Sequence, residues 1–252
     1  MKLSRRAWLG ILGGLSVAYG LKSGFIPLPS TKSALAVLPA SSPVSSVWGF
    51  TDQPELRHFI DEFLLDSNWT LVLPFNEKHL GIGSALETDW MAAGVYEGLA
   101  QEGYNKNFDK DVFNESGSLV GGGKLIVADG MVNYGARFYE FIENTSPIFY
   151  STEGGLHYVR RDTGERIGEY YSDEGKDVFA LTIFRDSKFD TVFEGKGLKW
   201  QGTYAASQYV KREVENGDLE NNIHHWEVVE WTATHQDNYP RVEDNYRILA
   251  WG

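Results

Sequence analysis

Two short apolar runs, each followed by a helical pattern, constrain the fold of this chain more than any other feature. Residues 69–73 (WTLVL) and 124–128 (KLIVA) have the length and character of buried strands. A helical pattern begins at Thr88 and ends by Gly103, and a second one covers residues 134–142. Because strands that alternate with helices form parallel sheets, we expect an α/β fold.

The second half of the sequence is richer in strand signals. Residues 156–160 and 165–170 alternate around Asp162-Thr163-Gly164, which predicts a β-hairpin. Further expected elements are strands at 178–184, 191–193, 226–231 and 246–251 and a helix at 202–214. The sum is an α/β domain with a mixed, mostly covered β-sheet and about three helices, after an N-terminal export segment.

Two of these patterns also predict which side chains face inward. In the helix at 134–142, Phe138, Phe141 and Ile142 are expected on one apolar side. In the strand at 226–231, Glu227 and Glu230 are expected to point outward while the apolar residues point inward.

The first residues carry an export pattern. Lys2, Arg5 and Arg6 precede an uncharged run of 15 residues at 7–21, which is shorter than the roughly 20 residues needed to span a bilayer. Ala34-Leu35-Ala36 is a small-x-small cleavage site, and Ser4-Arg5-Arg6 is similar to a twin-arginine signal. The alternatives are an uncleaved membrane anchor and a core helix at the start of the chain.

These patterns predict a domain organisation. We expect a twin-arginine-like signal peptide at 1–36, a Pro- and Ser-rich linker at 37–46, and a single α/β domain at 47–252. The change of character in the second half allows two sub-domains that meet near residue 150.

Charge and cysteine content exclude several classes of function. The chain has no cysteine, which excludes disulfides and thiolate metal sites. Its formal charge of −12 disfavours nucleic acid as a partner, because phosphate binding needs a cationic face. Removal of residues 1–36 would leave 18 Lys and Arg against 35 Asp and Glu, a formal charge of −17. Such a surface stays soluble outside the cytoplasm.

One acidic cluster is a candidate metal site. Asp237, Asn238, Glu243 and Asp244 fall within eight residues between two expected strands. Oxygen ligands clustered in a loop suit Ca²⁺, although the spacing differs from that of an EF-hand loop. A solvated acidic turn is the alternative interpretation, and no other cofactor is expected.

Three Asn-x-Ser/Thr sequons are candidate glycosylation sites in an exported protein. They begin at Asn68, Asn114 and Asn144. The last two are better placed, because they fall in expected loops.

No catalytic residue can be assigned from the sequence. The six histidines occur in no recognisable triad order, and Ser207 lies within an expected helix and not in a nucleophile elbow. Enzymatic activity is therefore left open, with a non-enzymatic role favoured.

Four groups of segments are distinctive when they are taken together: 71–73 with 88–93 (TDWMAA), 120–133 (VGGGKLIVADGMVN), 198–206 (LKWQGTYAA) and 226–231 (WEVVEW). In this combination they resemble the α/β domain of archaeal S-layer and S-layer-like surface proteins. The resemblance implies a surface-envelope protein of this domain type and transfers no catalytic residues. The chain is shorter than lattice-forming S-layer proteins.

These observations favour an exported, non-enzymatic cell-surface or envelope protein that acts through protein contacts. Its expected partners are other envelope proteins or itself, with membrane contact only if the N-terminal segment is uncleaved. The alternatives are an extracytoplasmic module that binds a small ligand or carbohydrate, using some of its eight tryptophans, and then an exported hydrolase.

Overall fold

The structure is a computed structural model that describes residues 53–59, 69–74, 87–100, 105–112, 124–128, 133–186 and 191–252. The expected export segment at 1–36 and linker at 37–46 lie outside these ranges. Within them, the strands are β1 (Trp69–Leu73), β2 (Asn105–Phe108), β3 (Lys124–Ala128), β4 (Ile148–Ser151), β5 (His157–Arg160), β6 (Arg166–Glu169), β7 (Lys176–Arg185), β8 (Thr191–Gly197), β9 (Trp226–Thr232) and β10 (Asn245–Trp251). The helices are α3 (Leu56–Phe59), α4 (Glu87–Leu99), α5 (Asp109–Val112), α6 (Tyr134–Arg137), the π-helical segment η3 (Phe138–Ile142), α7 (Trp200–Asn216) and the 3₁₀ segment η4 (Leu219–Asn221).

The described strands form two sheets. The larger has seven strands in the order β10-β9-β7-β8-β3-β1-β2, and the smaller has three in the order β4-β5-β6. β2, β1, β3 and β8 run parallel to one another, whereas the pairs β8–β7, β7–β9 and β9–β10 are antiparallel. The expected mixed α/β sheet is therefore confirmed.

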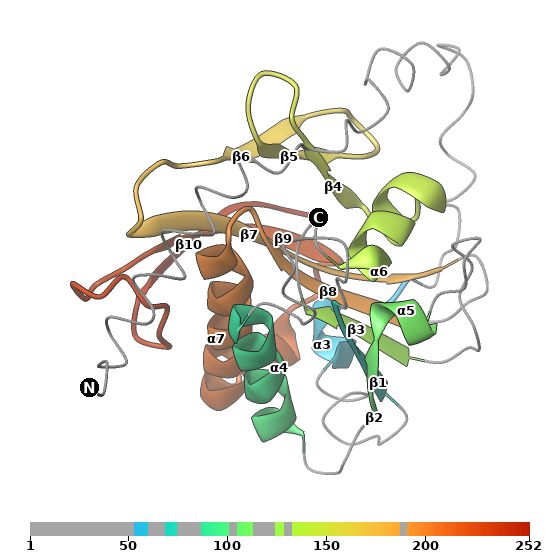
Figure 1. Cartoon of the computed structure of the whole chain (residues 1–252), viewed down its shortest axis with the longest axis horizontal. Coiled ribbons are helices and arrows are strands. Elements are labelled where there is room, and N and C mark those ends of the chain that lie inside the picture. Colours follow the sequence, from blue (N-terminus) through green and yellow to red (C-terminus); the bar gives the residue numbers. More distant parts are fainter. Residues whose placement is uncertain are drawn as a thin grey trace, which may run out of the picture.

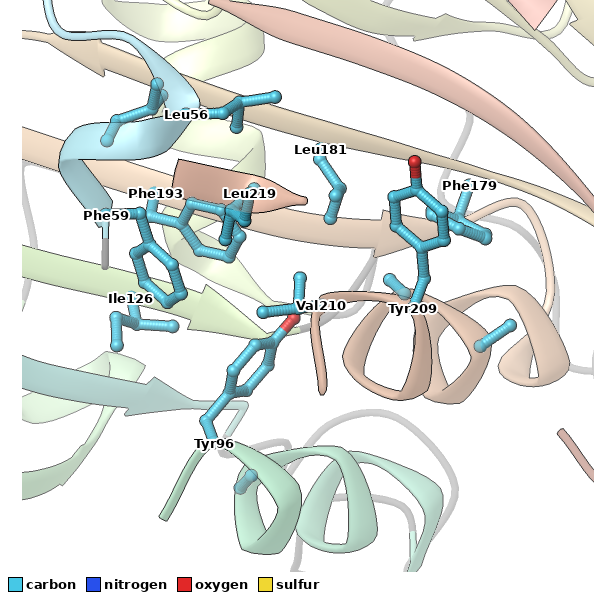
Figure 2. Close-up of a cluster of buried hydrophobic side chains, with 14 of the residues drawn as sticks. Leu56, Phe59, Tyr96, Ile126, Phe179, Leu181, Phe193, Tyr209, Val210 and Leu219 are labelled. Atoms are coloured by element: carbon cyan, nitrogen blue, oxygen red, sulfur yellow. The ribbon is translucent and has the colours of Figure 1, made fainter. Parts of the chain in front are cut away.

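Helices cover one face of the large sheet. α4 and α7 lie side by side on this face, while the small sheet lies on the opposite side of the large one (Figure 1). Figure 2 shows the core beneath the helices, where Phe59 of α3 stacks on Phe193 of β8 with ring centroids 3.9 Å apart. Tyr96 of α4 meets both rings edge-on. These contacts fix the central strand β8 against α4.

The opposite face packs against the small sheet and the α6–η3 unit. Ile148, Tyr158 and Ile167 of the small sheet share one apolar cluster with Val178 and Val228 of the large sheet. The possible sub-domain division near residue 150 falls at β4, whose side chains belong to this shared cluster. β8 is therefore buried on both faces along its whole length.

The expectation that Glu227 and Glu230 point outward is wrong. Both are buried in β9, on opposite faces of the sheet. Glu227 accepts from Asn222 at 2.7 Å, and Glu230 accepts from Tyr171 at 2.7 Å. The alternation rule fails here because β9 is covered on both sides, so its polar residues are satisfied by neighbours and not by water.

The expected apolar side of the helix at 134–142 is also wrong. Phe138 is buried, but Phe141 and Ile142 are 40% and 52% exposed. The reason is that α-helical geometry ends at Arg137 and π-helical geometry follows, which changes the direction of successive side chains. Tyr139 and Glu140 are the residues that turn inward instead.

The helices that the structure describes include none with the length and apolar character needed to cross a membrane.

Candidate functional site

A charged cluster is buried between β8 and the α6–η3 unit. Glu194 and Lys196 are two residues apart on β8, so their side chains project from the same face of the sheet. Glu140 of η3 and Ser146, which precedes β4, approach this face from the covering layer. The side chains of Glu140, Glu194 and Lys196 are completely inaccessible to solvent.

Lys196 is the centre of the cluster. Its Nζ lies 2.5 Å from Oε1 of Glu140 and 2.7 Å from Oε2 of Glu194. It also donates to the carbonyl oxygen of Ile148 at 2.8 Å and lies 3.1 Å from the hydroxyl of Ser146. Four acceptors thus surround the three N–H donors of the ammonium group, which is what allows a cation to be buried.

The two carboxylates have different surroundings. Oε2 of Glu194 accepts from Ser146 at 2.6 Å and from Thr182 at 2.9 Å in addition to Lys196, whereas Oε1 has no hydrogen-bond partner. Apart from Lys196, Glu140 receives one long bond of 3.3 Å from the amide of Tyr150. Negative charge is therefore better supported on Glu194 than on Glu140.

Tyrosine hydroxyls and an arginine hold the backbone around the cluster. Tyr158 donates to the carbonyl of Lys196 at 2.6 Å, and Tyr150 donates to that of Gly197 at 3.0 Å. Arg161 donates to the carbonyls of Glu140 and Ser146, each at 2.6 Å. The covering layer is thereby fixed to β8 from several directions.

The burial and charge of the cluster shift its protonation equilibria. Burial raises the pKa of Glu140 to about 7, and the neighbouring charge of Glu194 adds to this effect although Lys196 opposes it. Burial alone would lower the pKa of Lys196, but the two carboxylates raise it above its ordinary value. Near neutral pH the cluster thus contains a cation beside a carboxyl group that is readily protonated.

A second feature is the exposed edge formed by β10, which is the outer strand of the seven-stranded sheet in the described part of the chain. Trp251 is 60% exposed and Ile248 45% exposed, and His224 stacks on Trp251 with ring centroids 4.4 Å apart. Ile223, next to His224, is also exposed. We refer to Ile223, His224, Ile248 and Trp251 as the β10 edge.

The charge of β10 is unusual for so acidic a protein. Among Asn245–Trp251 the one charged residue is the cation Arg247, which pairs with Glu230 of β9 at 2.9 Å. The pairing register between β10 and β9 shifts between Ile248 and Ala250, so the ladder that joins these two strands is irregular at this point.

In the structure, the candidate calcium ligands contact different protein groups. Asp244 is buried, and its carboxylate accepts from Trp231, Thr234 and Arg241. Asp237 pairs with Arg241 at 2.7 Å, Glu243 lies 3.3 Å from His235, and Asn238 has a left-handed φ of 51°. Within the described ranges, no three His, Asp or Glu side chains are grouped to hold a metal ion. Calcium binding stays a prediction.

Of the candidate glycosylation sites, the structure describes Asn144, while Asn68 and Asn114 lie outside the described residues. Asn144 is exposed and adopts a left-handed φ of 60° in the turn after η3. Its side chain donates to Ile142 and accepts from Arg161 at the surface. Its accessibility is compatible with a glycan acceptor, and glycosylation stays a prediction.

The histidines that the structure describes contact backbone atoms or carboxylates. These contacts join His58 to Glu55, His157 to Gly155, His224 to Glu227, His225 to Pro54 and His235 to Glu243. The hydroxyl of Ser207 donates to the carbonyl of Tyr204 at 2.8 Å. The geometry therefore adds no support to the hydrolase interpretation.

Sequence reasoning missed the buried charged cluster. The expected strand at 191–193 stops before Glu194, because a Glu-Gly-Lys-Gly sequence is more typical of a turn. The sequence does contain a signal for the cluster, because Glu194 and Lys196 are two residues apart and directly follow an apolar strand. Their partner Glu140, however, is 56 residues from Lys196 and has no local signal.

Comparison with known proteins adds no assignment. The sequence matches no protein-family model, and a search of curated proteins found no significant match.

Proposed function

We propose that this chain is an exported, non-enzymatic cell-surface protein, similar to S-layer proteins, that acts through contacts with further copies of itself or with other envelope proteins. The observation that carries the proposal is the β10 edge, where Ile248 and Trp251 are exposed on a strand that has no neighbour on its outer side in the described part of the chain. Exposed strand edges with apolar side chains are sites at which another chain can add.

The charge distribution supports this edge as the contact surface. Copies that each carry a formal charge of −12, or −17 without residues 1–36, repel one another over most of their surfaces. β10 itself carries one cation and no anion, so this strand presents no negative charge of its own to a second copy. Antiparallel pairing of the same strand from two copies would give a two-fold symmetric contact.

Binding to envelope fragments tests the proposal. The protein purified from its native envelope is mixed with washed fragments and sedimented, and the wild type is expected to sediment with them. Trp251→Ser should reduce the bound fraction severalfold. Trp90→Ser is the matched control, because Trp90 is an exposed tryptophan of α4 that lies outside the β10 edge. Equal binding by both variants would contradict the assignment of the contact to β10.

A carbohydrate-binding module is the second candidate, and the pair formed by Trp251 and His224 favours it. An exposed indole can stack on a sugar ring, and the adjacent imidazole can supply a hydrogen bond. Tryptophan fluorescence titrated with envelope oligosaccharides separates the candidates. A saturable change that Trp251→Ser abolishes, with no sedimentation by envelope protein, would favour the carbohydrate-binding module.

A further inference from the structure

The buried cluster holds the amine of Lys196 in direct contact with the carboxyl group of Glu140. Nζ of Lys196 lies 2.5 Å from Oε1 of Glu140, both side chains are inaccessible to solvent, and the two residues are 56 positions apart. Exclusion of water and fixed orientation are the conditions under which two groups react with a high effective concentration.

Glu194 is positioned to move protons for such a reaction. Its Oε2 is 2.7 Å from Nζ of Lys196, and Ser146 and Thr182 hold that oxygen in place. Its other oxygen, Oε1, has no hydrogen-bond partner and is therefore an open acceptor position. A carboxylate within hydrogen-bond distance of the reacting nitrogen has the geometry of a general base.

The protonation state of Glu140 fits its role, whereas the two carboxylates raise the pKa of Lys196, so the amine must first give up a proton to Glu194. If both carboxylates were ionised, the cluster would bury two negative charges beside one positive charge. Three donors stabilise the charge on Glu194, whereas Glu140 has a raised pKa and is the carboxyl group that holds a proton more readily. A protonated carboxyl group is the form that an amine can attack.

We propose that Lys196 and Glu140 become joined by an isopeptide bond, with Glu194 as the group that accepts and returns protons. Lys196 first transfers a proton from Nζ to Glu194, and the neutral amine attacks Cδ of the protonated Glu140. The Nζ–Cδ bond forms and the bond from Cδ to the hydroxyl oxygen breaks. The hydroxyl leaves as water with the proton from Glu194, which takes the second proton from Nζ and ends as a neutral acid.

The product removes the main cost of the cluster. Ion pairs buried away from water contribute little net stability, because desolvation offsets their attraction. An amide leaves no charge in this site, and the reaction needs no oxidant or cofactor. The bond would tie η3 to β8 covalently in a chain that has no cysteine for a disulfide. This inference does not depend on the proposed surface function.

Peptide mapping of the purified full chain tests the proposal. Trypsin cleaves after free lysine but not after acylated lysine, so the bond predicts that residues 189–199 remain uncut at Lys196 and are joined to residues 138–160. The joined species should weigh less than the sum of the two peptides by one water molecule, about 18 Da. Separate peptides and cleavage at Lys196 in a chain with native circular dichroism would overturn the proposal.

Three comparisons make the test specific. Glu194→Gln keeps both reacting groups and should abolish the joined species, whereas a joined species in that variant would contradict the role of Glu194. Glu140→Gln should give the same joined peptide as the wild type, because an amide can react with loss of ammonia instead of water. Lys176, paired with Glu230 at 2.9 Å but partly exposed, is the internal control and should be cleaved normally.

Discussion

The hydroxyl of Tyr96 in α4 occupies the place where a side chain at Gly195 in β8 would begin. The tyrosine is fully buried, and its hydroxyl has no hydrogen-bond partner. Burial accordingly raises its pKa far above the ordinary value. The close approach of α4 to the central strand thus requires glycine at 195, and it leaves one polar atom unsatisfied in the core.

Replacement of Tyr96 by phenylalanine should stabilise the protein. The substitution removes a buried hydroxyl without a partner, which costs a folded protein on the order of 1–3 kcal/mol. We expect Tyr96→Phe to raise the free energy of unfolding by about 1 kcal/mol, since packing is otherwise kept. Chemical denaturation measures this change, and a loss of stability would show that the hydroxyl is satisfied.

The same contact predicts coupling between the two positions. Gly195→Ala should destabilise the wild type by about 1–3 kcal/mol, because the new methyl group overlaps the hydroxyl of Tyr96. In the Tyr96→Phe background the cost should fall to less than half, because the overlapping atom is absent. A double-mutant cycle measures this coupling, and additive effects would contradict the close approach.

A buried aspartate should make stability depend on pH. Asp177 of β7 accepts from the amides of Lys199 and Gly202 at the start of α7 and from that of Val178. Burial nevertheless raises its pKa to about 6 from 3.8, an effect that Lys199 opposes. The folded state therefore holds this proton more tightly than the unfolded state, so stability is lost as pH rises from about 4 to 6.

The size of this effect follows from the shift in pKa. A shift of one pKa unit corresponds to about 1.4 kcal/mol. Ionisation of Asp177 should therefore lower the free energy of unfolding by roughly 3 kcal/mol across that range. Urea denaturation at several pH values measures the slope. Asp177→Asn should lower stability at every pH, because α7 loses acceptors for its first amides, and should flatten the slope between pH 4 and 6. An unchanged slope in the variant would contradict the assignment.

Asp244 gives a prediction of the opposite sign. Bonds from Trp231, Thr234 and Arg241 lower its pKa although burial opposes them. The contribution of Asp244 to stability is therefore present above pH 4, and it is lost as pH falls through the lowered pKa of this group. We expect Asp244→Ala to cost about 3 kcal/mol at pH 7, because several buried donors lose their acceptor.

The same aspartate separates a structural turn from a calcium site. A structural turn, with the oxygens of Asp244 engaged by protein donors, predicts that thermal unfolding is the same with a chelator as with added Ca²⁺. A melting temperature that falls by several degrees in chelator would instead support calcium binding by Asp237, Asn238, Glu243 and Asp244.

How much could be predicted from the sequence depends on the range of the interactions involved. The bounds of β1 and β3 follow from local apolar runs, and the expected ranges 69–73 and 124–128 match them. β2 (Asn105–Phe108) was missed because its sequence NKNF has no strand character, and it forms by pairing with β1.

The candidate sites show the same limit. That Glu194 and Lys196 share a face follows from the strand period, but what covers that face depends on a π-helical turn that no local pattern indicates. The inward turn of Glu140 and the burial of Glu227 are likewise set by layers that come from distant parts of the chain. The periodicity of apolar residues therefore could not predict which charged side chains are buried.

Sedimentation velocity across a salt series tests most directly whether the chain acts through self-complementary contacts at β10. Salt at 0.15 M shortens repulsion between like charges to about 8 Å, which lets short-range apolar contacts decide. Association of the wild type should strengthen as salt rises and strengthen further with divalent cations. Ile248→Lys should abolish it, whereas Ile142→Lys, at an exposed isoleucine of η3, should not. A monomer under every condition, or equal association of both variants, would contradict the account.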